Sequence, residues 1–237
     1  MTRHNIQIAS AYFVSNAFSS LTVGLYAVCL SWYMLSQSHQ PAAVGWFFAT
    51  ASLASLLITP FFSAWLSNGL RTLSVFHGAI LIRSAAFFIP ALLNLHWFSD
   101  AFTIPLILLI AGLFGPTNTL CASALDALAM SHFDAEERRV LSKRVSLVRQ
   151  LSLTGGSLIA AGALATPIMG ITDLIAIGGL FSALAGLPFF KWAVRQRQAS
   201  CAKDSKLQHK SRFKVFQGFA SLTQSPRLLP PALMVVL

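Results

Sequence analysis

The stretch IASAYFVSNAFSSLTVGLYAVCLSWYML, from Ile8 to Leu35, decides the fold because it carries no charged residue from end to end. A helix needs about 20 mostly apolar residues to cross the roughly 30 Å hydrocarbon layer of a bilayer. This stretch is long enough, so we predict a membrane-spanning helix. It lacks the basic leader and the cleavage site of a removable signal peptide, and we expect it to remain in the mature chain.

Five further apolar stretches follow, and a seventh begins near Leu228 and runs to the last residue, Leu237. The five extend from Ala43 to Leu66, Leu73 to Leu95, Phe102 to Leu125, Val145 to Thr166 and Leu174 to Ala193. Hydrophobic residues make up 55% of the 237 residues and charged residues only 10%, which is more apolar surface than a soluble domain can bury. The predicted fold class is therefore an all-α membrane protein with six complete transmembrane helices and the start of a seventh.

Three regions are expected along the chain. They are a six-helix transmembrane bundle over 1–193, a basic cytoplasmic linker over 194–227, and the start of a truncated seventh transmembrane helix over 228–237. In the linker, Phe213, Phe216, Phe219 and Leu222 have a spacing that favours an amphipathic interfacial helix over a calmodulin-binding segment. Asp126 to Arg144 is a longer polar connection, in which we expect a solvated or interfacial helix.

The cationic residues are distributed on one side of the predicted membrane. Sixteen of the seventeen Lys and Arg residues fall in segments that share a side with the N-terminus, and the opposite loops, 36–42, 96–101 and 167–173, contain none. Cationic loops resist translocation, so we predict a multi-pass protein of the cytoplasmic (inner) membrane with a cytoplasmic N-terminus. Topology and anionic membrane lipids explain the formal charge of +10, and we expect no nucleic-acid partner.

No catalytic or metal-binding motif is present in the sequence. The chain has no P-loop, GxSxG or HExxH sequence and no pair of carboxylates inside a predicted span. Its three cysteines, Cys29, Cys121 and Cys201, are far apart and lack ligand spacing. We therefore expect no enzyme activity, no metal and no cofactor, and any pumping would draw on an ion gradient or a partner subunit.

Arg83 stands out because it lies well inside the third predicted span, where a guanidinium must face protein, water or a partner rather than lipid. It either takes part in substrate or gating electrostatics or anchors the bundle by hydrogen bonds. Its candidate partners in the first and fourth spans are Asn16, Ser19, Ser20, Tyr26, Asn118, Thr119 and Asp126. Asn16 and Asn118 themselves either line a cavity or hold helices together. The candidates for close helix packing are Gly155, Gly156 and Gly162.

The layout of the spans, together with three phrases, resembles a transporter family. The phrases are NAFSSLTVGLYAVCLSWYML from Asn16, RQLSLTGGSLIAAGALA from Arg149 and FQGFASLTQSPRLLPPALMVVL from Phe216. They are similar to bacterial exporters of the enterobactin-exporter and macrolide-efflux type, and the whole chain resembles the N-terminal half of a major facilitator superfamily transporter. The resemblance implies alternating access between two six-helix halves, with cargo bound between them near the midplane.

The family motif GxLaDRxGRR, between the second and third spans, is largely replaced. Its equivalent, SAWLSNGLRTL, has Ser63 at the glycine, Ser67 at the aspartate, Asn68 at the first arginine and Arg71 at a later basic position. In the family this aspartate helps to latch the two halves on the cytoplasmic side, so Ser67 departs from the standard gate. The fourth span also lacks the arginine of many proton-coupled antiporters, which weakens the assignment of a proton as coupling ion.

The resemblance implies a secondary active transporter that exports a small organic molecule such as a siderophore or a drug. Cargo would lie against the first and fourth helices, with Asn16, Tyr26, Arg83 and Asn118 as lining residues. The expected partners are this cargo, membrane lipids, a coupling ion, and a missing C-terminal half or a second copy of the chain. The alternative is a truncated or degenerate membrane protein that does not transport and acts as an interaction partner.

Overall fold

The computed structural model of the chain describes residues 3–66, 69–92, 100–166 and 170–203. They form six helices, which are α1 (Arg3–Ser38), α2 (Pro41–Leu66), α3 (Gly69–Leu92), α4 (Asp100–His132), α5 (Ala135–Leu164) and α6 (Ile171–Lys203). These four stretches contain no strand, so the all-α prediction is confirmed for them. The predicted seventh helix lies outside the described residues.

Five of the helices are long and apolar enough to cross a membrane. Their candidate spans are Ile6–Ser38, Pro41–Phe61, Ile104–His132, Ala135–Leu164 and Ile171–Phe190. In α3 the described apolar segment, Thr72–Phe88, is shorter, and the sixth complete span stays a prediction. The architecture is compatible with a multi-pass membrane protein.

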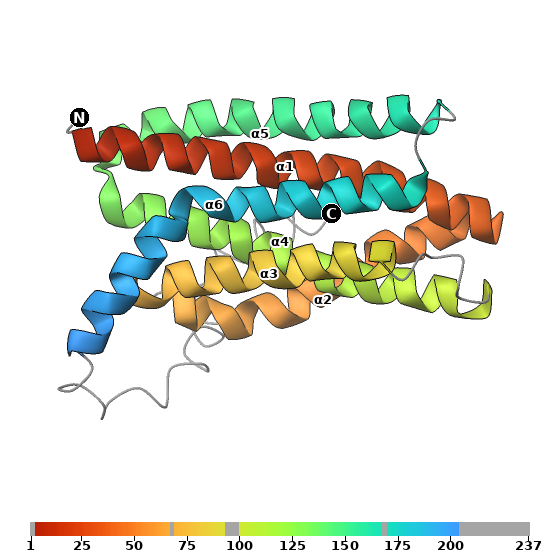
Figure 1. Cartoon of the computed structure of the whole chain (residues 1–237), viewed down its shortest axis with the longest axis horizontal. Coiled ribbons are helices and arrows are strands. Elements are labelled where there is room, and N and C mark those ends of the chain that lie inside the picture. Colours follow the sequence, from red (N-terminus) through yellow and green to blue (C-terminus); the bar gives the residue numbers. More distant parts are fainter. Residues whose placement is uncertain (1–2, 67–68, 93–99, 167–169, 204–237) are drawn as a thin grey trace, which may run out of the picture.

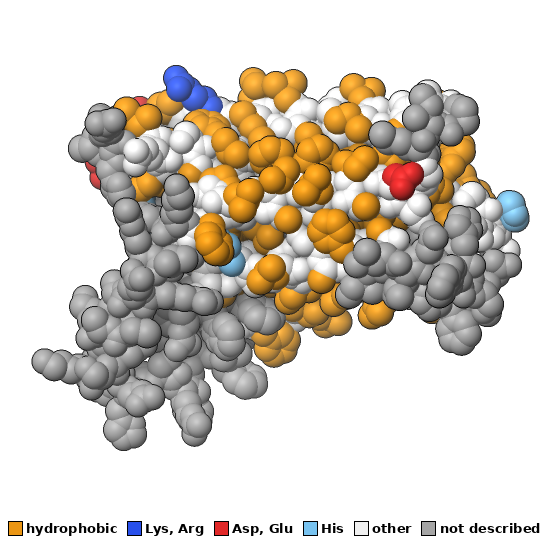
Figure 2. Space-filling view, in the orientation of Figure 1, with side chains coloured by type: hydrophobic (Ala, Val, Ile, Leu, Met, Phe, Trp, Pro, Cys, Tyr) orange, Lys and Arg blue, Asp and Glu red, His pale blue; other side chains and the backbone are white. Residues whose placement is uncertain are grey.

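The surface of the bundle carries an apolar belt. Figure 2 shows hydrophobic side chains spread over the middle of one face, while the visible Lys, Arg, Asp and Glu side chains lie toward its two ends. Large apolar side chains are exposed on α2 and α5, among them Trp46, Leu57 and Leu158. Such contiguous apolar surface is unfavourable in water and is covered by lipid tails in a bilayer.

The six helices pack as two three-helix units that repeat each other (Figure 1). α1 lies along α5 and α6, and α4 lies along α2 and α3. Exchanging α1 with α4, α2 with α5 and α3 with α6 turns the main contacts of one unit into those of the other, and α3 and α6 pack on each other. The smaller contact between α1 and α2 has no comparable counterpart between α4 and α5. Consecutive helices run in opposite directions, so α4, α2 and α3 each run opposite to their counterparts α1, α5 and α6, and the second unit is inverted relative to the first.

Two glycines at matching contacts of the repeat lie where helices meet closely. A Cβ added at Gly24 in α1 would overlap the Leu153 carbonyl oxygen of α5, and one added at Gly115 in α4 would overlap the Ala51 carbonyl oxygen of α2. Ser157 and Ser55 lie beside these glycines, each one helical turn after the overlapped carbonyl. Small residues let membrane helices meet backbone to backbone, and here they do so in both units.

α4 and α5 extend further than hydropathy predicts. α4 continues past Leu125 to His132 and α5 begins at Ala135, so only Phe133 and Asp134 separate them. The predicted polar connection is helical, as expected, but it forms the ends of two long helices rather than a separate helix. Packing explains the difference, because one core cluster contains Leu128, Ala129, Phe133, Leu141 and Val145.

α6 also outlasts its predicted span, which ends at Ala193, and continues to Lys203. Its last part, drawn in blue in Figure 1, turns away from the bundle. Pro188 lies inside α6, and proline removes an i to i−4 hydrogen bond and kinks a helix. Residues 194–203 of the predicted linker are thus helical, whereas the segment from Phe213 to Leu222 lies outside the described residues.

Candidate functional site

A polar network joins α1, α4 and α5 toward the end of the bundle that holds the N-terminus. Arg149 of α5 donates from Nη2 to Oδ1 of Asp126 in α4 at 3.1 Å and from Nε to Oδ1 of Asn16 in α1 at 2.6 Å. The Tyr12 hydroxyl donates to the same Asp126 oxygen at 2.8 Å. Asn16 donates from Nδ2 to the Tyr12 carbonyl at 2.8 Å. Four side chains from three helices therefore form one connected network.

Helical spacing explains why these groups meet. Tyr12 and Asn16 are four residues apart and so lie on one face of α1, where both are buried. A guanidinium at the level of an apolar helix interior is unfavourable without polar partners, and the network supplies them to Arg149. Charge-assisted hydrogen bonds of this kind are roughly twice as strong as neutral ones.

The network borders a cavity of about 350 Å³ between α1, α4 and α5. Asp126 and Arg149 are partly open to it, with 49% and 35% of their side-chain surfaces exposed. The cavity is lined by Tyr12, Asp126, Ala129, Met130, Arg138, Leu141, Ser142, Val145, Ser146 and Arg149. Its size falls within the range of small-molecule sites, which is roughly 300 to 1,000 Å³.

Arg138 gives this cavity a second guanidinium. Its Nε is enclosed and has no hydrogen-bond partner in the part of the chain that the structure describes. No ion pair forms between Arg138 and Asp126. The cavity therefore holds two guanidinium groups and one carboxylate, and that carboxylate already accepts two hydrogen bonds on one oxygen.

Arg83 of α3 is completely enclosed, with 0% of its surface exposed. Its Nε donates to the Ser182 hydroxyl of α6 at 2.8 Å, and its Nη1 donates to the Ser19 hydroxyl of α1 at 2.9 Å. Among the described residues, Nη2 has no hydrogen-bond partner and no carboxylate lies within ion-pair distance. The guanidinium thus links α3 to α1 and α6. It does not line the cavity between α1, α4 and α5.

Tyr26 lies in an aromatic cluster contributed by α1, α2, α3 and α4. Its ring stacks on Phe114 with a centroid separation of 3.6 Å, and the centroids of Phe47 and Phe87 lie 5.2 and 5.5 Å away. Only 3% of Tyr26 is exposed, and its hydroxyl is buried without a partner within the described stretches. In this state Tyr26 is a core residue.

The four predicted lining residues do not surround one cavity. Asn16 belongs to the network beside the cavity, Arg83 is enclosed between α1, α3 and α6, and Tyr26 belongs to the aromatic cluster. Asn118 is partly buried in α4 and makes no hydrogen bond within the described chain. Of the candidate partners of Arg83 on α1 and α4, Ser19 is the one that bonds to it.

The predicted loop-motif residues fall at the edge of what the structure describes. Ser63 belongs to α2 and Arg71 to α3, and Ser67 and Asn68 lie outside the described residues. Among the predicted packing glycines, a Cβ on Gly156 would overlap the Leu21 carbonyl of α1, whereas Gly155 and Gly162 have nothing within 4 Å. Of the three predicted packing glycines, Gly156 therefore lies at the α1–α5 contact, and Gly155 and Gly162 do not.

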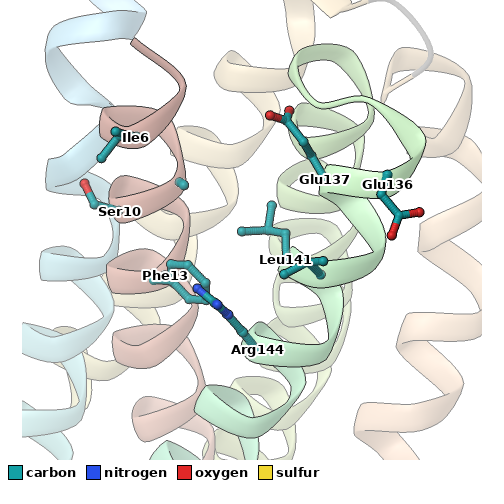
Figure 3. A pocket seen from close by; sticks show the side chains of 9 residues that line it. Ile6, Ser10, Phe13, Glu136, Glu137, Leu141 and Arg144 are labelled. Carbon is teal, nitrogen blue, oxygen red and sulfur yellow. The ribbon is translucent and has the colours of Figure 1, made fainter. Parts of the chain in front are cut away.

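A second, apolar cavity of about 530 Å³ lies between the beginnings of α1 and α5. Figure 3 shows Arg144 reaching toward Phe13 of α1, while Glu136 points away from α1. The cavity is lined by Ile6, Ala9, Ser10, Phe13, Glu136, Glu137, Val140, Leu141 and Arg144. Leu141 borders both cavities, which therefore flank the first turns of α5.

Sequence reasoning missed Tyr12, Arg138, Arg149 and Ser182. Arg149 carries a weaker signal of the same kind as Arg83, because it lies near the cytoplasmic start of the fifth predicted span, where its guanidinium needs water or polar partners. Tyr12 could have followed from Asn16, one helical turn away. The pairing of Arg149 with Asp126 has no such signal, because it depends on how α4 and α5 rotate against each other.

No group of three or more His, Cys, Asp or Glu side chains in the described residues is arranged to hold a metal ion. Comparison of the chain with known protein families, with curated proteins and with solved structures gives no match.

Proposed function

We propose that this chain is one six-helix half of a secondary active transporter of the major facilitator type. It lies in the cytoplasmic membrane with its N-terminus inside and exports a small organic molecule by alternating access. The observation that carries the proposal is the pair of inverted three-helix units, in which α1 with α5 and α6 repeats α4 with α2 and α3. Inverted repeats with cargo bound at their interface are a recurrent plan of secondary transporters.

The exposure of α2 and α5 supports a second bundle as partner. In the most apolar stretch of each helix, only 6% of the residues of α2 and 11% of those of α5 are buried inside the protein, compared with 44% in α1, α4 and α6. The open face of α5 is not uniformly apolar, because Gln150 and Thr154 are exposed within its candidate span. Polar side chains at this depth favour a neighbouring protein or a water-filled path over lipid. A second copy of the chain or a separate half supplies that neighbour.

The α1–α4–α5 cavity supplies the cargo site of this proposed carrier. Its polar network spans α1 and α4, the two helices against which the resemblance places cargo. Asp126 is the one carboxylate in the cavity lining, and we propose that its ion pair with Arg149 takes part in coupling. Replacing Asp126 by asparagine removes this ion pair, so coupling that depends on it should be lost.

Proteoliposomes test the proposal. The chain is reconstituted with an imposed pH gradient and an entrapped pH-sensitive dye, and a panel of lipophilic cations, catecholates and carboxylates is added. At least one class is expected to move only when the gradient is present, and Asp126→Asn is expected to abolish that dependence while Glu136→Gln keeps it. No gradient-dependent movement of any class would refute a carrier formed by copies of this chain alone.

A further inference from the structure

We propose that the α1–α4–α5 cavity binds an oxyanion, meaning a carboxylate or phosphate group, through Arg138 and Arg149. The identification of that oxyanion as part of the cargo rests on the proposed function and makes the cargo an organic anion. The binding site itself rests on the cavity lining alone.

The charges of the cavity favour an anion. Arg138 and Arg149 contribute two permanent positive charges against the single carboxylate of Asp126. A cation would therefore meet a net positive lining, and a neutral molecule would leave the excess charge uncompensated. A bound carboxylate or phosphate balances it.

The hydrogen-bonding capacity of the lining points the same way. Arg149 uses Nε on Asn16 and one Nη2 proton on Asp126, which leaves its other donors available. Arg138 has an enclosed Nε that donates to no described residue. The hydroxyls of Ser142 and Ser146 also line the cavity. Guanidinium groups match the geometry of carboxylate and phosphate oxygens, so the surplus of donors selects an oxyanion.

The apolar part of the lining suits an organic body attached to that group. Met130, Leu141 and Val145 border the same cavity, and methionine adapts to ligands of varied shape. A volume of about 350 Å³ exceeds what an isolated oxyanion fills. The same chemistry is presented by an organic anion in solution and by the headgroup of an anionic phospholipid.

Arg139 provides a matched control for Arg138. It is the next residue in α5, carries the same charge and is exposed, but it does not line the cavity. Arg138→Gln and Arg139→Gln therefore change the net charge of the protein equally. Only the first removes a guanidinium from the site.

The experiment measures binding without transport. The full chain in detergent is titrated with inorganic phosphate and with benzoate, against sodium chloride of equal ionic strength, and the unfolding midpoint is followed. A saturable rise is expected, with the dissociation constant increased about tenfold or more in Arg138→Gln and unchanged in Arg139→Gln. A parallel series compares lipid nanodiscs with and without phosphatidylglycerol.

The outcomes distinguish a soluble organic anion from a lipid headgroup as the ligand, and they distinguish the oxyanion site from the proposed carrier function. A response to phosphate or benzoate that depends on Arg138 supports the site and assigns it to soluble organic anions. A response only to phosphatidylglycerol, with the same dependence, supports the oxyanion site, assigns it to a lipid headgroup and overturns the cargo identification. No response in either series, or equal loss in both variants, overturns the site. Binding without movement in the flux assay retains the site and rejects a carrier formed by copies of this chain alone.

Discussion

Arg149 and Asp126 are 23 residues apart in sequence, and their side chains form an ion pair of 3.1 Å between α5 and α4. The same guanidinium bonds to Asn16, so one side chain couples three helices. α4 and α5 are joined by a turn of only Phe133 and Asp134, and this pair is a second link between the two helices.

The Asp126–Arg149 pair is expected to show a measurable coupling energy. Both side chains are more than a third exposed, so the coupling should be small, about 0.5 to 1 kcal/mol. A double-mutant cycle of Asp126→Asn and Arg149→Gln, measured by denaturant unfolding in detergent, gives the value. Pairing Arg149→Gln with Glu136→Gln provides the control, because Glu136 forms no ion pair in the described chain. Strict additivity of the first pair would contradict the assignment.

Hydropathy was sufficient to predict that the chain is helical and approximately where five of the spans lie. Hydropathy predicts that the fourth span ends at Leu125 and that the fifth begins at Val145, because it measures only how well a segment suits lipid. The helices themselves continue through the polar residues between these points. Leu128 and Leu141 show this, since they are buried against neighbouring helices in a segment that reads as polar. A single sequence contains no information on the rotation of one helix against another. For that reason the sequence predicts that Arg83 needs polar partners but does not identify Ser182 as one of them.

Gly155 and Gly156 are adjacent but should respond oppositely to alanine. A Cβ at Gly156 overlaps the Leu21 carbonyl of α1, and backbone cannot move aside cheaply, so Gly156→Ala should destabilise the bundle by about 1 to 3 kcal/mol. Gly155 has nothing within 4 Å, and Gly155→Ala should be neutral or stabilising by up to about 1 kcal/mol. The unfolding midpoints of the two purified variants decide the matter. Similar midpoints would mean that α1 and α5 do not meet as described.

The internal repeat makes a parallel prediction for Gly24 and Gly115. Alanine at either position overlaps a carbonyl oxygen, of Leu153 or of Ala51, so both variants should lose a similar amount of stability, about 1 to 3 kcal/mol. Gly112 lies one turn before Gly115, and a Cβ there makes only an ordinary contact of 3.8 Å with Thr50. Gly112→Ala should therefore leave the unfolding midpoint almost unchanged. A loss at Gly24 with none at Gly115 would argue against equivalent packing of the two units.

Arg83→Met separates the structural role of Arg83 from a role in transport. Burying a guanidinium without a carboxylate is unfavourable, and an apolar side chain of similar length removes that penalty, so the variant should be at least as stable as the parent. Ser19→Ala deprives Arg83 of an acceptor and should cost about 1 to 3 kcal/mol in the parent, but much less when combined with Arg83→Met. Flux of a stable Arg83→Met protein then reports function directly. Parental flux would remove Arg83 from the mechanism, and reduced flux with normal insertion would retain it.

The orientation of the bundle is tested at the two short turns that lie at its opposite ends. Gln40, between α1 and α2, and Asp134, between α4 and α5, are both exposed. If the cationic segments face the cytoplasm, a cysteine at Gln40 faces outward and one at Asp134 faces inward. In a background with Cys29, Cys121 and Cys201 changed to alanine, an impermeant maleimide should label Gln40→Cys in intact cells and Asp134→Cys only after permeabilisation. Gln40 is preferable to its neighbour His39, whose φ of 53° would strain a substituted side chain. The reverse labelling pattern would place the oxyanion cavity on the outer side of the membrane and would contradict the proposed cytoplasmic N-terminus.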